Sequence, residues 1–367
     1  MKGEITAGER VVRCLLGQPI DRVPFGVGLG WQPWGDALAH WQADSGLAEI
    51  KLESYFGYDP SFAIPELESG IWPPLPTQVI SEDAEFIVMR DGRGITSRGR
   101  RDGLSMPEWL DYPIKMPDDW WRLKAERLQI NEPGRVHQNW VGFRSRLRTT
   151  GEAVQVGVYP WGMFGSARDL LGVERLLESF YDAPEMVYDI MEHLTSLWIR
   201  LWERVAAEVQ IDHIHIWEDM SGKQGSLISP SMVRQFMMPQ YDRIVAFARN
   251  RGVRLVSVDT DGDCRELVPL MCSHGINTFL PFEVQAGNDI REYRRQYPEL
   301  GIIGGLDKRA LAAGREEVEV EVARAAEMVR LGRYIPGFDH LIPPDATWEN
   351  MRYAAQEIRK VCYEAGG

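Results

Sequence analysis

One stretch decides the fold: Ile211-Asp-His-Ile-His-Ile-Trp-Glu-Asp219. Isoleucines alternate with polar residues in it, and successive side chains of a strand point to opposite faces, so Ile211–Trp217 is predicted to be a buried strand. The strand ends in two acids, Glu218 and Asp219, and a loop rich in Gly and Ser follows as far as Pro230. A buried strand that delivers carboxylates into a loop is typical of the active sites of α/β barrels.

Strands and helices alternate on both sides of this stretch, from residue 152 to the C-terminus. The other buried strand patterns in this part are Ala153–Tyr159, Val253–Asp259, Ile276–Pro281, Leu300–Gly305 and Tyr334–Gly337. Helical patterns separate them, and this alternation predicts parallel β-α units. With Val23–Leu29 as the first strand and a second strand that no clear pattern places, the count reaches eight. Eight such units predict a (β/α)8 or TIM barrel.

The N-terminal part is less regular. Thr6 and Glu9 form a capping box, which predicts a short helix ahead of the first strand. Residues 86–96, Phe-Ile-Val-Met-Arg-Asp-Gly-Arg-Gly-Ile-Thr, predict a β-hairpin that turns at Asp91-Gly92. We therefore expect an α/β protein with a single domain over residues 1–367. It would be a TIM barrel with an N-terminal helical extension and a hairpin insertion at about residues 79–103.

Composition fits this expectation. The chain has 367 residues, 44% of them hydrophobic and 26% charged, as in a globular protein large enough for a barrel. Its net charge of −13 disfavours nucleic acid as a partner, because phosphates would be repelled. The four cysteines form no Cys-x-x-Cys motif, and neither a signal peptide nor a membrane span is evident. We expect a cytoplasmic protein that contacts no membrane.

Five segments follow the predicted strands and carry polar, aromatic or glycine residues. They are Tyr159-Pro-Trp161, Trp217-Glu-Asp219, Asp259-Thr-Asp-Gly-Asp263, Gly304-Gly-Leu-Asp307 and Gly337-Phe-Asp-His340. The carboxyl ends of parallel strands meet at one face of a barrel, where the active site lies. We therefore expect these five segments to surround a substrate.

The chain resembles the uroporphyrinogen decarboxylase superfamily in these segments. The resemblance rests on Trp217-Glu-Asp219, Ile228-Ser-Pro230, Met238-Pro239, Asp261-Gly-Asp263, Gly305-Leu-Asp-Lys308, Gly337-Phe-Asp-His-Leu-Ile-Pro-Pro344 and, at the start, Glu9-Arg-Val-Val-Arg13 and Asp21-Arg-Val-Pro24. It implies a TIM barrel with a deep cleft and, frequently, a homodimer. Its chemistry is either decarboxylation of a porphyrinogen without a cofactor or methyl transfer that involves corrinoids and zinc.

Two departures from the family's patterns bear on this choice. The decarboxylases carry arginines after the first strand that grip substrate carboxylates, whereas Gly26–Trp34 contains none, and the Tyr they place after the third strand is missing from Phe164–Arg168. The methyltransferases that activate a thiol use His-x-Cys-Gly where this chain has Asp259-Thr-Asp261-Gly262, and their later Cys falls near Phe338. The resemblance therefore favours the methyltransferase-like branch, with ligands other than thiolates.

A zinc site of oxygen and nitrogen ligands is the expectation that follows. Residues i and i+2 of a strand share a face, so Asp259 and Asp261 would both point into the barrel. With His340, and with His215 and Asp339 as further candidates, they could hold zinc with an open position for substrate. Such a metal would polarise the oxygen of a methyl ether. The alternatives are loops held by Asx turns at Asp259–Asp263, a hydrogen-bonded interior His215 and a helix cap at Asp339.

The remaining candidates surround these ligands. Asp219 shares its phase with Trp217 and is the predicted inward acid, whereas Glu218 would cap a helix or bind an Arg. Asp219, Asp261 and His340 are the predicted catalytic residues, acting as acids, bases or orienting groups. The predicted substrate-binding residues are Trp31, Trp34, Tyr159, Trp161, Trp217 and Asp307, the last with a structural ion pair to Lys308 or Arg309 as its alternative.

The first functional hypothesis is a methyltransferase. It would demethylate a small methylated substrate, with a methoxy-aromatic compound as one candidate, and pass the methyl group to a corrinoid protein. The alternatives are a cofactor-independent decarboxylase of the uroporphyrinogen type and a non-catalytic barrel that binds a small ligand. Zinc and a corrinoid carried by a partner protein are the expected cofactors of the first hypothesis only.

Overall fold

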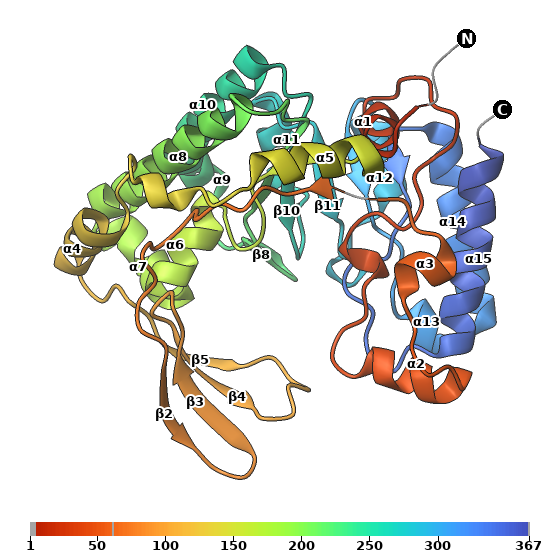
Figure 1. The fold of residues 1–367 in the computed structure, drawn as a ribbon, viewed down its shortest axis with the longest axis horizontal. Coiled ribbons are helices and arrows are strands. Elements are labelled where there is room, and N and C mark those ends of the chain that lie inside the picture. The colour runs from red at the N-terminus through yellow and green to blue at the C-terminus, as the bar shows by residue number, and fades with distance from the viewer. Residues whose placement is uncertain (1–4, 61, 366–367) are drawn as a thin grey trace.

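The computed structural model describes residues 5–60 and 62–365. Its main sheet has seven parallel strands in the order β1-β6-β7-β10-β11-β12-β13, with helices packed around its outer side (Figure 1). The strands are β1 (Phe62–Ala63), β6 (Ala153–Val156), β7 (His213–Trp217), β10 (Leu255–Thr260), β11 (Thr278–Pro281), β12 (Gly301–Ile303) and β13 (Tyr334–Ile335). The six strands predicted after residue 152 are all present, and the sheet curls as a half-barrel.

The prediction of Val23–Leu29 as the first of eight strands is wrong. This segment is extended without strand pairing and ends in the 3-10 helix η1 (Leu29–Trp31). Pro24 has no N–H to give to a ladder, and Gly26 and Gly28 have φ of 77° and 98°, which no regular strand accommodates. The segment is buried nonetheless. Further along the chain, Pro33 forms an isolated parallel bridge with Ile342, which follows the edge strand β13. The unplaced second strand is the two-residue β1.

The helix predicted from the capping box is α1 (Ala7–Leu15), whose cap Thr6 accepts a hydrogen bond from the Glu9 backbone N–H. It packs across the amino ends of the strands on both sides of the open sheet. Gly8 lies against Ala153 at the start of β6, and the Cys14 thiol donates to the carbonyl of Tyr334 at the start of β13. The N-terminal helix thus covers the end of the sheet opposite to the predicted site.

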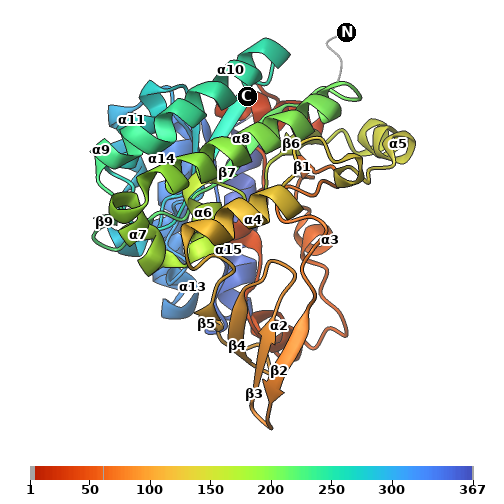
Figure 2. The same ribbon diagram turned by 90° about the vertical axis from the view of Figure 1, so that its left-hand side faces the viewer.

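The insertion is larger than the predicted hairpin. It is a four-stranded antiparallel sheet of β2 (Gln78–Glu82), β3 (Phe86–Arg90), β4 (Thr96–Arg100) and β5 (Glu108–Asp111), which projects from the body (Figures 1 and 2). The predicted hairpin is its central pair, β3 and β4. The turn uses Gly94, with φ of 84°, and not Gly92, because the Asp91 carboxylate accepts the backbone N–H groups of Arg93 and Ile95.

Helices and short strands fill the connections. They are α2 (Ala37–Ser45), α3 (Leu52–Phe56), α4 (Pro117–Arg127), η2 (Pro133–Arg135), α5 (Trp140–Thr150), α6 (Met163–Leu171), α7 (Val173–Asp182), α8 (Pro184–Ala206), β8 (Ser221–Gly222), β9 (Gly225–Ser226), α9 (Pro230–Met232), η3 (Val233–Met237), α10 (Met238–Arg251), α11 (Leu267–Ser273), η4 (Val284–Ala286), α12 (Ile290–Gln296), α13 (Ala310–Ala313), α14 (Arg315–Leu331) and α15 (Trp348–Glu364). Among the described residues, no helix combines the length and apolarity needed to cross a membrane.

Candidate active site

Two of the predicted catalytic residues meet at the carboxyl ends of the strands. Asp261 follows β10 and His340 follows β13, and their Oδ2 and Nε2 atoms lie 3.4 Å apart. Both side chains are about one-third exposed. The pKa of His340 is raised, first because the Asp261 carboxylate accepts a hydrogen bond from its ring and despite the opposing effect of burial. The pair therefore favours a protonated imidazole that substrate can reach.

A second Asp–His pair lies deeper. His215 on β7 and Asp259 on β10 approach to 3.5 Å between Nε2 and Oδ2, and both side chains are almost buried. Burial raises the pKa of Asp259, and the hydrogen bond from His215 opposes this rise. Asp259 is the register partner of Trp217, so both side chains face the concave side of the sheet. Asp259 thus faces the barrel interior, as the alternation of strand residues predicted, and His215 lies beside it.

These four side chains form two pairs and not one cluster of ligands. Across residues 5–60 and 62–365, no group of three or more His, Cys, Asp or Glu side chains is arranged to hold a metal ion. The arrangement thus does not supply the three ligands that a catalytic zinc site requires. Zinc at Asp259, Asp261 and His340 therefore stays a prediction.

Asp339, a further candidate ligand, accepts hydrogen bonds from the backbone. Its carboxylate is fully buried and accepts the backbone N–H groups of Val284 and Lys308 at 2.8 and 3.2 Å. It therefore ties together the loops after β11, β12 and β13. The Lys308 ammonium lies 3.6 Å from it and adds a cation beside His340. Sequence reasoning did not assign Lys308 to the site, although it stands in the Gly305–Lys308 motif.

Glu218 and Asp219 have separate roles. Glu218 is fully buried and caps α6, accepting the backbone N–H groups of Met163, Phe164 and Gly165 and the hydroxyl of Tyr241. Burial raises its pKa to about 7 against these donors. The helix-capping alternative for Glu218 is therefore confirmed.

Asp219 has a left-handed φ of 42°, and its carboxylate lies 2.6 Å from the Arg168 guanidinium. This ion pair neutralises the acid that was predicted to point inward. Arg168 also donates to the Asp219 carbonyl. The sequence signal for this partner was weak because Arg168 lies 51 residues before Asp219, on a separate helix. Asp219 thus sits at the rim of the site as half of an ion pair.

The predicted aromatic wall is present only in part. The exposed ring of Tyr159 meets Trp217 edge to face, with centroids 4.6 Å apart. Trp161 and Trp34 are half-buried; the first packs against Gly70, and the Trp34 backbone N–H bonds to Ile342. Trp31 is fully buried and its indole N–H bonds to Pro336, so its predicted substrate contact is wrong.

Asp307 forms the ion pair that was its structural alternative. Its carboxylate lies 2.6 Å from the Arg309 guanidinium, and the two residues share a bidentate contact. Asp263 is held in the same way by Arg265, which lowers its pKa through the side-chain hydrogen bond. Two of the acids at the strand ends are therefore balanced locally by an arginine two residues further on.

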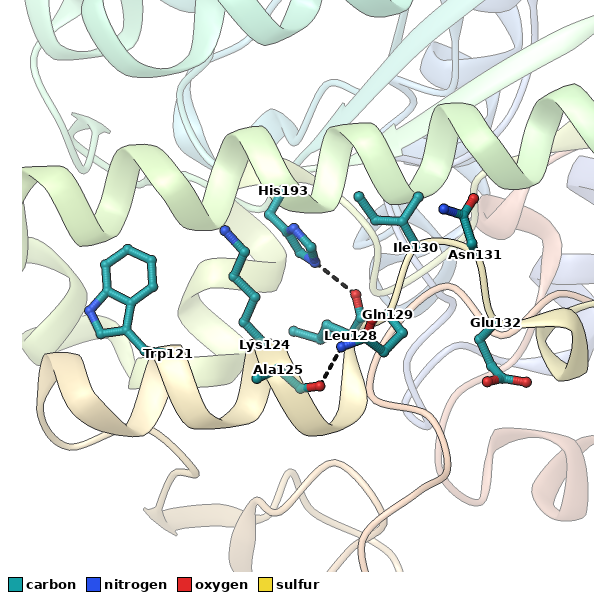
Figure 3. Close-up of a pocket in the computed structure, with 9 residues that line it drawn as sticks. All are labelled: Trp121, Lys124, Ala125, Leu128, Gln129, Ile130, Asn131, Glu132 and His193. Carbon is teal, nitrogen blue, oxygen red and sulfur yellow. Dashed lines mark hydrogen bonds between the residues drawn. The ribbon is translucent and has the colours of Figure 1, made fainter.

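One cavity lies away from this cluster. It measures about 590 Å³ and lies between α4 and α8 (Figure 3), and its lining consists of Trp121, Lys124, Ala125, Leu128, Gln129, Ile130, Asn131, Glu132 and His193. None of the predicted site residues lines it. Its two ionisable groups nearest α8 are engaged, because Lys124 pairs with Asp189 and His193 bonds to the Leu128 carbonyl. We place the site at the strand ends, where the Asp261–His340 and Asp259–His215 pairs lie.

A small cavity lies at the strand ends themselves. It measures about 10 Å³, room for roughly one water molecule, and the residues around it are Val27, Gly28, Leu29, Gly30, Leu280, Pro281, Ile303, Gly304, Gly337 and Phe338. The segment that replaces the first strand thus contributes backbone and small side chains to the centre of the half-barrel. The interior below the site is packed, as in other barrels of this kind.

Comparison with known proteins places the chain in a family. Residues 121–361 match the family described as uroporphyrinogen decarboxylase (URO-D). A methyltransferase from Methanosarcina mazei has a similar solved structure, with a TM-score of 0.60 and 15% identity over 97% of this chain and 100% of that one. A search of curated proteins gave no match. Because the family match covers more than half of the sequence, the chain belongs to the uroporphyrinogen decarboxylase family.

Proposed function

We propose that this member of the URO-D family is a methyltransferase. It would take a methyl group from a small methylated substrate, such as a methoxy-aromatic compound, and pass it to a corrinoid carried by a partner protein. The fold shared with a methyltransferase supports this proposal, as do the sequence departures from the decarboxylase pattern at Gly26–Trp34. The observation that carries it is the Asp261–His340 pair at the strand ends.

The pair supplies the acid that demethylation needs. Removing a methyl group from an ether leaves an alkoxide or phenolate oxygen that must gain a proton. The His340 Nε2–H faces Asp261, so the other ring nitrogen, Nδ1, is the donor left for the leaving oxygen. The Asp261 carboxylate orients the ring and stabilises its charge. The corrinoid would supply the nucleophile that accepts the methyl group.

The cations around the site argue against a substrate with many carboxylates. Three arginines lie near the strand ends in the described structure, and each faces an aspartate: Arg168 with Asp219, Arg265 with Asp263 and Arg309 with Asp307. Arg265 and Arg309 hold their carboxylates in bidentate contacts, and Arg168 holds both the carboxylate and the carbonyl of Asp219. A guanidinium engaged in this way has little left to offer a second carboxylate. A porphyrinogen with its acetate and propionate arms would need several free cations. A small substrate with little negative charge fits this balance better.

The exposed aromatic pair supports a flat substrate. Tyr159 is 62% exposed and stands edge to face against Trp217, whose neighbour in register is Asp259. An aromatic ring placed against this pair would gain stacking or edge-to-face contacts of about 0.5–1.5 kcal/mol. A methoxy-aromatic substrate is therefore the first class to assay.

The proposal is tested by assaying the purified protein for both reactions of the family. Methyl transfer is followed with 4-methoxybenzoate as donor and reduced free cobalamin as acceptor, through the absorbance of the methylated product. Decarboxylation is followed as CO2 release from uroporphyrinogen. Methyl transfer without CO2 release is the expected result. CO2 release from uroporphyrinogen would replace the proposal with the decarboxylase alternative, and ligand binding without either reaction would favour the non-catalytic barrel.

Zinc belongs to this proposal as a separate prediction. If Asp259, Asp261 and His340 hold it once substrate draws the two pairs together, the purified protein will take up zinc when a methylated substrate is present. Asp261→Ala will then lose that uptake, and Asp242→Ala, whose carboxylate pairs with His274 away from the strand ends, will keep it. Elemental analysis after gel filtration measures both. Equal uptake by the two variants would contradict this ligand set.

A further inference from the structure

Polar residues form a chain inside the half-barrel, below the site. The His213 Nε2 atom lies 2.7 Å from the Ser257 hydroxyl, which lies 3.2 Å from the His215 Nδ1 atom. The other ring nitrogen of His215, Nε2, faces the Asp259 carboxylate at 3.5 Å. His213 also touches the ring of Phe62 on β1, across the intervening β6, so the chain runs along the concave side of the sheet.

Burial limits how protons can be distributed along this chain. His213 and Ser257 are 2% and 0% exposed. The His213 ring meets a hydroxyl at Nε2, and its Nδ1 has no partner among the described residues, so a charge on the ring would be buried and unpaired and the ring is neutral. A neutral imidazole has one N–H and one bare nitrogen. The Ser257 hydroxyl has a single hydrogen and must donate to one histidine while it accepts from the other. The hydrogen bonds among His213, Ser257 and His215 can therefore run in either of two opposite directions.

One direction leaves a smaller defect than the other. If Ser257 donates to His215 Nδ1, the N–H of His215 is at Nε2 and points at Asp259, and His213 donates its Nε2–H to Ser257. The His213 Nδ1 atom, which has no partner in the described structure, is then a bare acceptor. In the opposite direction, His213 would bury an unpaired N–H, and His215 would turn a lone pair toward a carboxylate. Unpaired buried donors are the costlier defect.

We propose that His213 and Ser257 fix His215 as its Nε2–H tautomer and that His215 thereby positions the Asp259 carboxylate in the active site. His213, Ser257 and His215 are positioning residues in this scheme, because they act through Asp259. The long 3.5 Å contact fits a free enzyme, since such hydrogen bonds often tighten only when substrate binds. The catalytic part of this inference rests on the proposed function, whereas the tautomers do not.

The tautomers can be measured without any activity. Long-range ¹H–¹⁵N spectra of histidine-labelled protein distinguish protonated from bare ring nitrogens, and His213→Gln and His215→Gln variants assign two of the seven histidines. The expected result is Nε2–H for both residues. Ser257→Ala should convert His215 to a mixture of tautomers. An Nδ1–H tautomer of His215 in the unchanged protein, or a His215 signal unaffected by Ser257→Ala, would overturn the proposal.

A matched variant separates this effect from a general loss of packing. Thr278 on β11 is the register partner of Ser257 and is equally buried. Its hydroxyl, however, donates to the Asn277 side chain and takes no part in the hydrogen bonds among His213, Ser257 and His215. Thr278→Val should leave both tautomers and kcat unchanged. Ser257→Ala should lower kcat about tenfold or more, as loss of an orienting partner typically does. Equal kcat in the two variants would contradict the positioning role, whereas no methyl transfer by the unchanged protein would contradict only the proposed function.

Discussion

At the scale of single residues, the acids of this protein are defined by their partners. Glu218 and Asp219 are neighbours in sequence, but Glu218 lies among the N–H groups of α6 and Asp219 pairs with Arg168. Alternation along a strand predicted that the two would point in opposite directions. Their partners come from α6 and α10, and no local pattern in the sequence identifies those.

The contact between Tyr241 and Glu218 gives a prediction about stability. The Tyr241 hydroxyl donates to the Glu218 carboxylate at 2.6 Å inside the protein. Tyr241→Phe removes this donor and should lower the free energy of unfolding by about 1–3 kcal/mol when Glu218 is ionised. Urea unfolding at pH 5 and pH 8 measures the effect.

The pH dependence has a definite sign. Because the pKa of Glu218 in the folded protein is about 7, above its ordinary 4.5, stability falls as the pH rises between these values. Losing the donor raises this pKa further, so Tyr241→Phe should cost more at pH 8 than at pH 5. Tyr334→Phe is the control, because its hydroxyl donates to the neutral Gly304 carbonyl. A cost for Tyr241→Phe that does not change with pH would refute this assignment.

His340 gives a second prediction at the same scale. Its hydrogen bond to Asp261 raises its pKa, so the imidazole should titrate above the ordinary 6.5. Asp261→Asn should lower this pKa, because the neutral amide no longer stabilises the imidazolium. An NMR titration of the ring signals measures both values. The stabilisation that the pair gives the fold is complete below the unfolded pKa and is lost as the pH rises through the raised one. Equal pKa values in the two proteins would show that the pair does not form in solution.

At the scale of elements, the strands of the main sheet from β6 onward were predictable because they are buried on both faces. Such strands read as short apolar runs between helices, and each predicted one is present. The N-terminal half was not predictable by the same means. β1 has only two residues, too few for a period, and Pro24, Gly26 and Gly28 disrupt the segment where the first strand was expected.

The contact of α1 with β6 gives a prediction at this scale. An alanine normally stabilises a helix relative to glycine by about 0.5–1 kcal/mol. At Gly8, however, an added Cβ would lie 2.2 Å from the Ala153 backbone nitrogen, which cannot move without disturbing the strand. Gly8→Ala should therefore destabilise the protein by about 1–3 kcal/mol.

Thermal unfolding compares this variant with a glycine elsewhere. At Gly99 in β4, an added Cβ would meet only the Pro107 side chain, at 3.8 Å. Gly99→Ala should be tolerated, and the midpoint of unfolding should fall for Gly8→Ala alone. A rise in stability for Gly8→Ala would mean that α1 does not close the amino ends of the strands.

At the scale of the whole molecule, parallel topology explains how much of the site could be predicted. Carboxyl ends of parallel strands lie at one edge whatever the loops between them do, so Asp261 and His340 could be expected to meet although 79 positions separate them in the chain. Ion-pair partners such as Arg168, and Trp31 in the core, depend on how individual loops pack. That information is spread over distant segments and has no local pattern.

The proposed role of the Asp261–His340 pair is to supply the acid for methyl transfer, and a comparison with an Asp–His pair outside the site tests this role. Asp242 and His274 form such a pair, and their Oδ1 and Nδ1 atoms lie 2.7 Å apart, away from the strand ends. Rates of methyl transfer from 4-methoxybenzoate to reduced cobalamin should be measured for His340→Ala and His274→Ala. His340→Ala should lower the rate about 10²-fold or more, as removal of a general acid does, and His274→Ala should leave it unchanged. Equal rates in the two variants would show that the Asp261–His340 pair does not have this role.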